Sequence, residues 1–381
     1  MVRLQAAGPV VEVEVPGATG ADPLVLRVRD GDDPAELVRA LRAAVRRGGV
    51  RLRLELDPAR PWPAEGEDAP ADAWSDDLSA LARRIDAAAS VVVLAGPGVV
   101  WDHAVPGLQA LATTLGAGVL NTWGAKGIFH WRSRHHWATI GLQEEDFRLG
   151  GLAEAELVVA TGLDDREAPD ACWADRPHVV VAPEHLAPLA EALAPRAADL
   201  TVPPLRARLA AATQAGWAAS AAPLAPSRVT LAYGRRLAGG GLVAADAGVA
   251  GFWVARTFAT TELGMVAVPA QAVPGWAAAC VAVSRLAAPL RPALGVLDDG
   301  VDEASAHVVD FAAARGVPVG LEVWGAAGDE LDAPAHEERL RGLADATGPG
   351  GVATLATDAG QLAAFVEAAG PVTAWRPPPA A

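Results

Sequence analysis

Lysine, cysteine and tyrosine are scarce in this chain of 381 residues. Lys126 is its only lysine, and the formal net charge is −15 at pH 7. A charge of this sign repels phosphate backbones and anionic membrane faces, so we expect neither nucleic acid nor a membrane surface as a partner. A small molecule or another protein is the expected partner instead.

Cysteine is limited to Cys172 and Cys280, which are far apart and show no Cys-x-x-Cys or Cys/His metal spacing. We predict that both are core thiols in a reducing cytoplasm. At the N-terminus, no apolar run of signal-peptide length follows Arg3, which also favours a cytoplasmic protein.

Long uninterrupted apolar runs are lacking as well. Residues 265–283 are nearly free of charge, but Pro269, Gln271 and Pro274 interrupt them. This pattern predicts a buried helix that begins near Pro274 and not a membrane span.

Several common catalytic signatures are absent: there is no Gly-x-Ser-x-Gly, no P-loop and no His-Glu-x-x-His. Histidine and arginine cluster at residues 130–136 and could bind an anion, although we interpret this stretch as a solvated connecting loop. The chain has 12 tryptophans. Three that are close in sequence are candidates for lining a pocket or a subunit contact: Trp123, Trp131 and Trp137.

The abundant residues are apolar ones, at 51% of the chain, which indicates a globular protein with sizeable cores. Apolar β-branched runs alternate with helical patterns rich in alanine and leucine. Continuous apolar strands between helices are typical of parallel sheets covered on both faces. The sequence therefore predicts an α/β protein with two doubly wound, Rossmann-like parallel-sheet domains. In the first of these domains we expect a helix at residues 104–115 and strands at 90–95, 117–120, 156–160 and 178–182.

Two composition shifts, at residues 61–74 and about 195–227, predict linkers, although the second contains a helical pattern at 205–214. They divide the chain into three parts, 1–61, 75–205 and 226–381. In the first part we expect a helix at 34–46 and a strand at 50–56.

In the middle part, the strand Val91–Ala95 leads into Gly96-Pro97-Gly98. A glycine turn between strand and helix can present backbone N–H groups to an anion at the positive end of a helix. Glycines that only shape a tight turn are the alternative.

In the third part, residues 292–297 form an apolar strand that ends in Asp298-Asp299-Gly300. Such a turn could hold a hard divalent cation against a diphosphate. A second strand, residues 317–324, ends in Gly325-Ala326-Ala327, which offers no amide side chain as a further ligand.

The middle part resembles the central domain of thiamine diphosphate-dependent carboligases and decarboxylases, the acetolactate synthase group. The resemblance is carried by Ala95-Gly-Pro-Gly98, Thr122-x-Gly-x-Lys-Gly127, His135 to Gly141 and Gly162-x-Asp-Asp-Arg166. In that family the domain holds FAD in some members, an adenine nucleotide such as ADP in others, and nothing in many. The resemblance implies cofactor contacts from Gly96, Gly98, Thr122, Gly162 and Arg166, with turn shaping as the alternative role.

The third part resembles the diphosphate-binding domain of the same family, through Asp246-Ala-Gly248, Trp253-x-x-Arg256 and the Asp298-Asp299-Gly300 turn. The resemblance implies Asp246 and Gly300 as contacts for thiamine diphosphate, and Asp299 with Asp298 as ligands of Mg²⁺.

This sequence departs from the family pattern in four ways. Asp298 replaces a glycine, Gly325 and Ala326 replace the two amides, and Ala272 replaces the large apolar residue that bends the cofactor. The fourth departure is that residues 1–61 resemble only a remnant of the pyrimidine-binding domain, where neither Glu12 nor Glu14 has the context of the activating glutamate.

Four departures that affect one mechanism favour a degenerate homologue, which would act as a partner subunit or as a small-molecule or nucleotide binder. Two alternatives stay open. One is an active thiamine diphosphate and Mg²⁺-dependent carboligase or decarboxylase of 2-oxo acids that a separate pyrimidine-domain chain completes. The other is an FAD- or ADP-binding protein that uses the middle part. The resemblance also implies a homo-oligomer, or a hetero-oligomer with such a second chain.

Overall fold

The computed structural model describes residues 76–197, 201–298, 300–325 and 327–375, together with the backbone of four strands before residue 56. The chain divides into two compact units, Met1–Ala73 and Trp74–Ala381. No helix within the described ranges has the length and apolar character that a bilayer crossing requires.

The N-terminal unit contains one sheet of four strands in the order β1-β2-β4-β3. Its strands are β1 (Gln5–Ala6), β2 (Val10–Val15), β3 (Leu24–Arg29) and β4 (Val50–Glu55). The pairs β1–β2 and β2–β4 are antiparallel, and β3–β4 is parallel. β4 confirms the strand expected from residue 50, whereas the helix expected at 34–46 lies outside the described residues.

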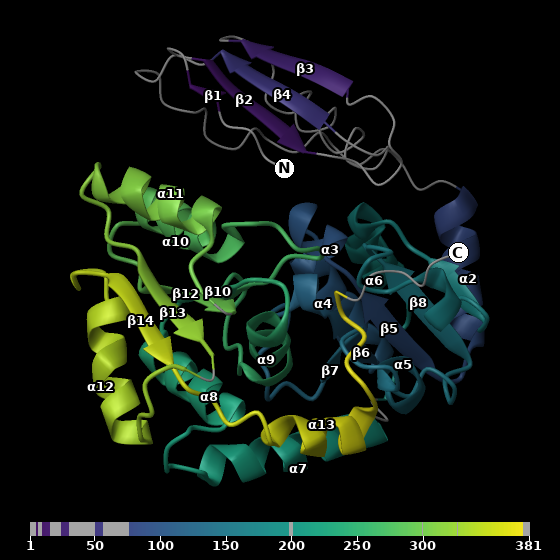
Figure 1. Cartoon of the computed structure of the whole chain (residues 1–381). Helices are drawn as coiled ribbons and strands as arrows, with labels where there is room; N and C mark the ends of the chain where they lie inside the picture. The colour runs from purple at the N-terminus through teal and green to yellow at the C-terminus, as the bar shows by residue number, and fades with distance from the viewer. Residues whose placement is uncertain are drawn as a thin grey trace, which may run out of the picture. The chain divides into compact units, whose positions relative to one another are not determined.

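The first sheet of the C-terminal unit has five parallel strands in the order β7-β6-β5-β8-β9 (Figure 1). The strands are β5 (Val91–Ala95), β6 (Gly118–Thr122), β7 (His136–Ile140), β8 (Leu157–Thr161) and β9 (His178–Val180). Its α-helices are α2 (Asp76–Ala87), α3 (Gly98–Trp101), α4 (Val105–Leu115), α5 (Asp146–Leu149) and α6 (Leu186–Ala192), with 3-10 turns η1 (Trp123–Ala125), η2 (Asp170–Cys172) and η3 (Pro183–His185).

The second sheet also has five parallel strands, in the order β11-β10-β12-β13-β14. The strands are β10 (Leu242–Ala245), β11 (Val266–Ala267), β12 (Ala293–Asp298), β13 (Gly320–Trp324) and β14 (Gly351–Leu355). The helices of this part are α7 (Pro204–Ala218), α8 (Pro226–Arg236), α9 (Val249–Thr257), α10 (Trp276–Ala287), α11 (Glu303–Ala313), α12 (Ala333–Ala344) and α13 (Gln361–Ala369).

Alternation along β5 explains why this strand is apolar throughout. Val91, Val93 and Ala95 belong to the core shared with α4 and α6, whereas Val92 and Leu94 belong to the core on the other face. Successive side chains of a strand point to opposite faces, so a strand covered on both faces needs apolar residues at every position. The prediction of two doubly wound parallel sheets is confirmed, and the middle and third parts at 75–205 and 226–381 stay predictions.

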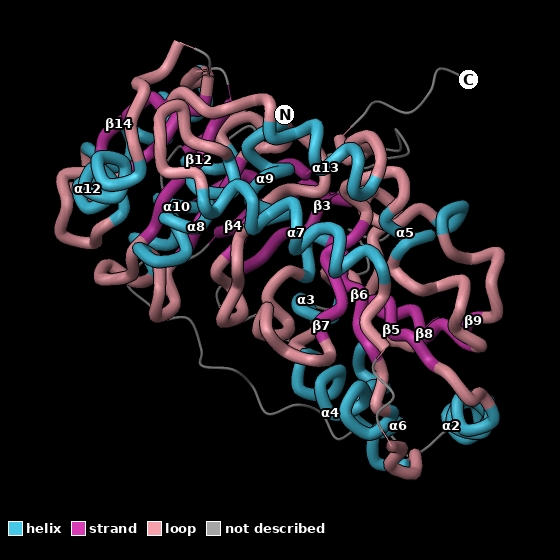
Figure 2. The backbone as a smooth tube through the Cα atoms, turned by 90° about the horizontal axis from the view of Figure 1, so that it is seen from below, coloured by secondary structure: helices cyan, strands magenta, loops and turns pink. Residues whose placement is uncertain are grey.

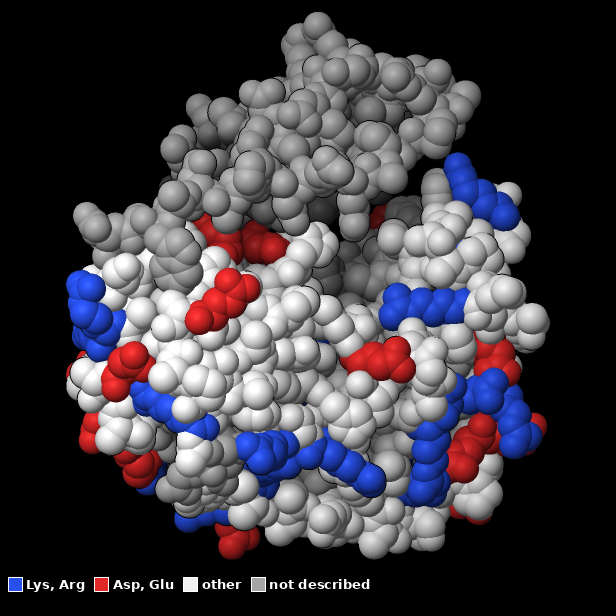
Figure 3. Space-filling view, turned by 180° about the vertical axis from the view of Figure 1, so that it is seen from behind, with Lys and Arg blue, Asp and Glu red and all other residues white. Residues whose placement is uncertain are grey.

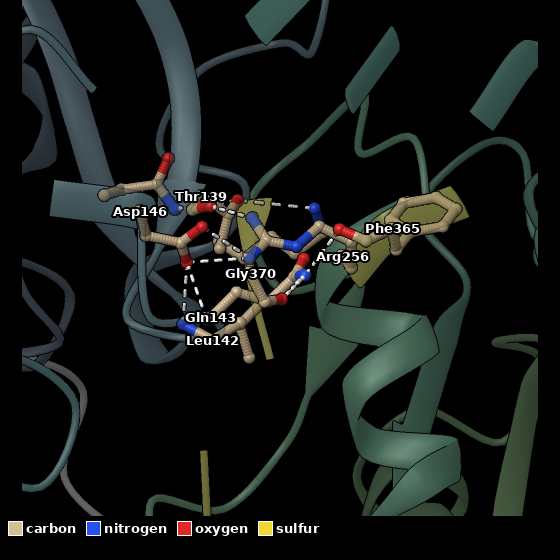
Figure 4. A network of polar contacts seen from close by, with 9 residues as sticks. Thr139, Leu142, Gln143, Asp146, Arg256, Phe365 and Gly370 are labelled. Carbon is tan, nitrogen blue, oxygen red and sulfur yellow. Dashed lines mark hydrogen bonds and ion pairs between the residues drawn. The ribbon is translucent and has the colours of Figure 1, made fainter. Parts of the chain in front are cut away.

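A buried polar network joins the two sheets within the C-terminal unit (Figure 4). Arg256 on α9 donates to both carboxylate oxygens of Asp146 on α5, at 2.7 and 2.8 Å, and to Thr139 O of β7 at 2.7 Å. Gln143 Nε2 donates to the carbonyl oxygens of Phe365 and Gly370 at 2.8 and 2.6 Å. The segment that follows β7 is therefore tied to α9 and to the middle and C-terminal end of α13.

Most of the second predicted linker, at about residues 195–227, is the helix α7. This helix packs against α8 and α13 and is seen from below in Figure 2. It extends the helical pattern expected at 205–214 to both sides. On the face shown in Figure 3, Lys and Arg side chains are interspersed with Asp and Glu, as on a solvated surface.

The prediction of two core thiols is wrong for Cys172, whereas Cys280 packs at the border of a core cluster. Cys172 is exposed in η2, and Cys280 is half-buried on α10; both are free cysteines. η2 lies on the connection between β8 and β9, and such connections run over the surface. The helix expected near Pro274 is confirmed as α10.

Candidate functional site

The carboxyl ends of β10 and β12 bring two of the predicted residues to one edge of the second sheet. Asp246 follows β10 directly, and Asp298 is the last residue of β12, which is adjacent and parallel to β10. In open α/β sheets, ligands bind outside this edge. The two carboxylates there, however, already have partners within the chain.

Asp298 caps the start of α9. Its Oδ1 accepts a hydrogen bond from the Ala250 N–H at 2.8 Å. Gly248, just before the helix, has a φ of 128°, and a Cβ there would lie 2.4 Å from Asp298 Oδ2. Glycine is therefore required beside this carboxylate. Because the start of a helix attracts anions, Asp298 occupies from within the chain a position that could otherwise receive a phosphate.

The start of α10 is engaged in the same way. Asp246 Oδ1 accepts from the Ala277 N–H at 2.9 Å, and Asp302 Oδ2 accepts from the Gly275 N–H at 3.2 Å. Burial raises the pKa of Asp246; the Ala277 N–H opposes this effect and the charge of Asp302 adds to it. Two helix starts at this edge thus each hold carboxylates of the chain itself.

The other residues predicted for this edge contribute little. An added Cβ would meet no atom within 4 Å at Gly300 or at Gly325, so a side-chain ligand would fit at Gly325 but none is present. Ala272 is exposed, and Asp299 and Ala326 lie outside the described residues. In the part of the chain that the structure describes, no group of three His, Cys, Asp or Glu side chains is arranged to hold a metal ion.

The predicted glycine turn of the first sheet packs against a second turn. Gly98 N–H donates to Gly162 O at 2.8 Å, and Gly96 N–H donates to Thr161 O at 2.9 Å. A Cβ would lie 2.4 Å from Gly162 O at Gly96 and 2.7 Å from Gly162 Cα at Gly98. These glycines allow two backbones to approach closely, and the N–H groups that a phosphate would need are already used.

Glu167 is a buried carboxyl group near these turns, and the sequence pattern did not reveal it as a candidate site residue. It is 2% exposed, its Oε2 accepts from the Gly124 N–H at 2.9 Å, and burial raises its pKa to about 7. Of the predicted residues nearby, Thr122 is buried at the end of β6, whereas Arg166 is exposed and pairs with Asp164 at 3.3 Å. Glu167 ends a run of four charged residues, in which no sequence signal marks it as the buried one.

A cavity of about 240 Å³ lies between β7, α7 and the residues that follow α9. Trp131 and Trp137 line it, which confirms the pocket role considered for them, and Lys126 and His136 line it as well. Trp123 instead lies in the core and packs against Trp375 in a tilted arrangement, with ring centroids 5.3 Å apart. The solvated loop predicted at residues 130–136 is confirmed, since His130, Arg132 and Arg134 are exposed. His136 is the exception, because it is partly buried at the start of β7.

A further buried polar cluster centres on Glu322 in β13. Its carboxylate accepts a hydrogen bond from Tyr233 and contacts His336 Nε2 at 3.1 Å and Arg339 at 3.1 Å. Trp324 Nε1 donates to the Tyr233 hydroxyl at 2.9 Å. Every member has a partner inside the cluster, although His336 Nδ1 and Arg339 Nε are buried without one. We interpret the cluster as a contact that packs α8 and α12 on the sheet.

Comparison with known proteins supports the resemblance of the middle part to the central domain of thiamine diphosphate enzymes. Residues 78–187 match the profile of the family described as "Thiamine pyrophosphate enzyme, central domain". No curated protein matches the sequence. Among solved structures, a similar one is described as the X-ray structure of "a putative thiamin diphosphate-dependent enzyme isolated from Mycobacterium smegmatis". It superposes with a TM-score of 0.58 at 16% identity and covers 77% of this chain and 67% of that chain.

The two helix-covered parallel sheets define an α/β protein with the fold of that structure. The profile match is more specific but local: residues 78–187 are similar to the central domain of thiamine pyrophosphate enzymes.

Proposed function

We propose that this chain is a non-catalytic relative of the thiamine diphosphate enzymes, in which the inherited fold serves to bind a small molecule. The observation that carries the proposal is the hydrogen bond between the Asp298 carboxylate and the Ala250 N–H at the start of α9. The chain thereby supplies its own anion at the sheet edge where the resemblance places the diphosphate.

A diphosphate fits this edge poorly. It would meet the carboxylates of Asp246, Asp298 and Asp302, and like charges about 4 Å apart repel by about 4 kcal/mol at an effective dielectric of 20. The N–H groups of Ala250, Gly275 and Ala277, which could have bound phosphate oxygens, already donate to those carboxylates.

The described residues at this edge also offer few free oxygen ligands for Mg²⁺. It prefers a near-octahedral set of oxygen ligands. Asp298 is committed to α9, and Gly325 offers a backbone carbonyl where an amide side chain would fit. Thiamine diphosphate with Mg²⁺ would therefore require rearrangement of both helix starts, and we derive no reaction through it.

The FAD or ADP alternative is also weakly supported, since Gly96 and Gly98 donate their N–H groups to the chain itself and Arg166 pairs with Asp164 at the surface. We therefore place the retained binding function elsewhere in the fold.

Calorimetric titration of the purified chain tests the proposal. With millimolar thiamine diphosphate and MgCl₂, and separately with FAD and ADP, we expect no saturable binding, and we expect a colourless protein. Stoichiometric binding of thiamine diphosphate by the chain alone would overturn the proposal. Binding that arises only after a pyrimidine-domain chain is added would replace it with the two-chain enzyme.

The variant Asp298→Asn tests the reason given for the lost affinity. The amide keeps an oxygen acceptor for Ala250 but removes the negative charge, so Mg²⁺-pyrophosphate should bind at least tenfold more tightly than to the wild type. Asp310→Asn, on the exposed face of α11, removes the same charge without this effect and is the control. Equal affinity of Asp298→Asn and wild type would show that Asp298 is not the obstacle.

A further inference from the structure

The cavity beside Lys126 is separate from the sheet edge just described. It lies beyond the C-terminal end of α9, where Thr257 and Phe258 line it, whereas Asp298 binds the N-terminal end of the same helix. The nine residues of α9, at about 1.5 Å of rise each, separate the two places by roughly 13 Å. A ligand in the cavity therefore does not depend on the diphosphate edge.

The polar groups around this cavity include donors that lack acceptors. The side-chain nitrogens of Trp137 and Trp217 are buried without a hydrogen-bond partner. Lys126 is only 8% exposed, and its Nζ has a long contact of 3.5 Å to Thr139 Oγ1. Buried donors are normally satisfied, so the two indole N–H groups, together with the weakly bound ammonium of Lys126, favour an acceptor that the chain does not itself provide.

The charges at the cavity point to an anionic acceptor. Among the described residues, no carboxylate forms an ion pair with Lys126 or with Arg206, whose guanidinium donates to the carbonyl oxygens of Ser133 and His136 at 3.3 and 2.6 Å. Arg256, by contrast, is neutralised by Asp146. Burying a cation without a counter-charge is costly, and a bound anion would remove that cost.

The titration of Lys126 agrees with this geometry. Burial, and then the charge of Arg256, lowers the pKa of Lys126 to about 7, while burial and the charges of Lys126 and Arg206 lower the pKa of His136 to about 3. Three cations therefore line the cavity: Lys126 at the end of η1, Arg206 on α7 and Arg256 on α9. The nearby acid is Asp146, which pairs with Arg256.

The walls of the cavity are aromatic. Trp131 and Trp217 meet edge to face with ring centroids 5.9 Å apart, and Phe258 and Leu209 complete the apolar lining. At about 240 Å³ the cavity is smaller than the roughly 300–1,000 Å³ of most drug-sized ligand sites, so it suits a molecule of one or two rings.

We propose that this cavity binds a small aromatic carboxylate, with its carboxylate at Lys126 and Arg206 and its ring against the wall formed by Trp131 and Trp217. The carboxylate accepts hydrogen bonds from the unsatisfied donors and neutralises Lys126, and the ring fills the apolar part. An amide of the same shape lacks the charge, and inorganic phosphate lacks the ring.

Calorimetry on the full chain at pH 6.5 with phenylacetate and indole-3-acetate tests the site. We expect one ligand per chain, with phenylacetamide and inorganic phosphate each at least tenfold weaker than phenylacetate. The absence of binding by both carboxylates at millimolar concentration would overturn the proposal, as would equal binding of phenylacetamide or of phosphate alone.

Variants locate the site. Lys126→Met keeps the length of the side chain and should weaken phenylacetate binding at least tenfold. Arg134→Gln, at an exposed position of the loop before β7, should leave it unchanged. Unchanged binding by a folded Lys126→Met, checked by its melting temperature, would contradict the proposal.

If Lys126→Met fails to fold, two other measurements test the site: phenylacetate binding by Trp217→Phe and the pH dependence of phenylacetate binding by the wild type. Trp217→Phe keeps a ring but loses the N–H donor and should bind more weakly. Because the carboxylate prefers the ammonium form of Lys126, affinity of the wild type should fall by up to tenfold per pH unit above about 7. A flat profile together with unchanged Trp217→Phe binding would overturn the proposal. Failure here would leave the result with thiamine diphosphate untouched, since the two titrations probe different ligands and places.

Discussion

Glu167 shows how one buried carboxyl group can make the stability of this protein depend on pH. In the folded chain burial raises its pKa from 4.5 to about 7. Between these values the unfolded chain releases the proton of Glu167 while the folded chain retains it. The unfolded state therefore binds fewer protons, and the free energy of unfolding falls as pH rises through this window.

We predict that Glu167→Gln removes this component, because glutamine can still accept from the Gly124 N–H but does not ionise. Chemical denaturation from pH 4.5 to 7.5 should show a smaller loss of stability for the variant than for the wild type. Glu184→Gln, at an exposed position of η3, should follow the wild-type curve. Parallel curves for Glu167→Gln and wild type would contradict the assignment.

At this scale the sequence indicated some residues and concealed others. Asp298 could be singled out because a carboxylate at the end of an apolar strand stands out, and Lys126 because it is the only lysine. Its partners in the cavity could not be found, since Arg206 and Trp217 come from a helix about eighty residues further along the chain. Glu322 was hidden because its neighbours in β13 are apolar and its partners are distant in sequence.

Among the elements, the turns after β5 and β8 depend on glycine. Gly162 has a φ of 58°, and a Cβ there would lie 2.5 Å from the Val99 nitrogen. We predict that Gly162→Ala lowers the free energy of unfolding by more than about 1 kcal/mol, because both the backbone conformation and the contact with α3 are strained.

The control for this substitution is a glycine with room around it. Gly342 lies inside α12, and a Cβ there meets no atom within 4 Å. Gly342→Ala should raise the stability by roughly 0.5–1 kcal/mol, as expected for a helix interior. Thermal unfolding of the two variants should thus shift in opposite directions, and a stable Gly162→Ala would refute the packing argument.

The Glu322 cluster holds β13 to α8 and α12. Removing its charge leaves Arg339 with only the exposed Asp329 as a counter-ion, so we predict that Glu322→Gln costs about 3 kcal/mol. Glu330→Gln, at an exposed position after the same strand, should change stability by less than about 0.5 kcal/mol. Urea denaturation of both variants checks the difference, and similar midpoints would argue against a structural role for the cluster.

The elements themselves were predictable where apolar runs are continuous, and their ends were less so. The second strand of the third part was expected from Val317, but β13 begins at Gly320. Pro318 has no N–H to give to a neighbouring strand, which delays regular pairing. The run at 178–182 similarly ends early, because Pro183 opens η3 directly afterwards.

At the scale of the C-terminal unit, the buried ion pair of Arg256 and Asp146 is one of the contacts that join its two sheets. Their side chains are 1% and 0% exposed, and they link α9 to α5. We predict that Arg256→Met lowers the free energy of unfolding by about 3 to 5 kcal/mol, since it leaves a buried carboxylate unpaired. Calorimetry should also show a broader transition, because the sheets lose a shared tie.

Arg341→Met provides the comparison. Arg341 pairs with Glu338 at the surface of α12, with side chains 63% and 69% exposed, and its loss should cost at most about 1 kcal/mol. If the two arginine variants were equally stable, the tie between the sheets would be energetically unimportant.

The sequence could not foresee this joint. Its residues are separated by more than a hundred positions, and no local pattern relates α5 to α9 or Gln143 to the end of α13. Residues that pack within one sheet leave a periodic signal, whereas residues that join two sheets leave none.

The position of Asp298 has a bearing on how the protein persists in a living cell. A coenzyme that completes a fold also protects it, so the amount of such a protein follows the supply of the vitamin. Here the anion at the start of α9 is the carboxylate of Asp298, which is part of the chain itself. Under the proposed function, starvation for vitamin B1 should therefore leave the lifetime of this protein unchanged.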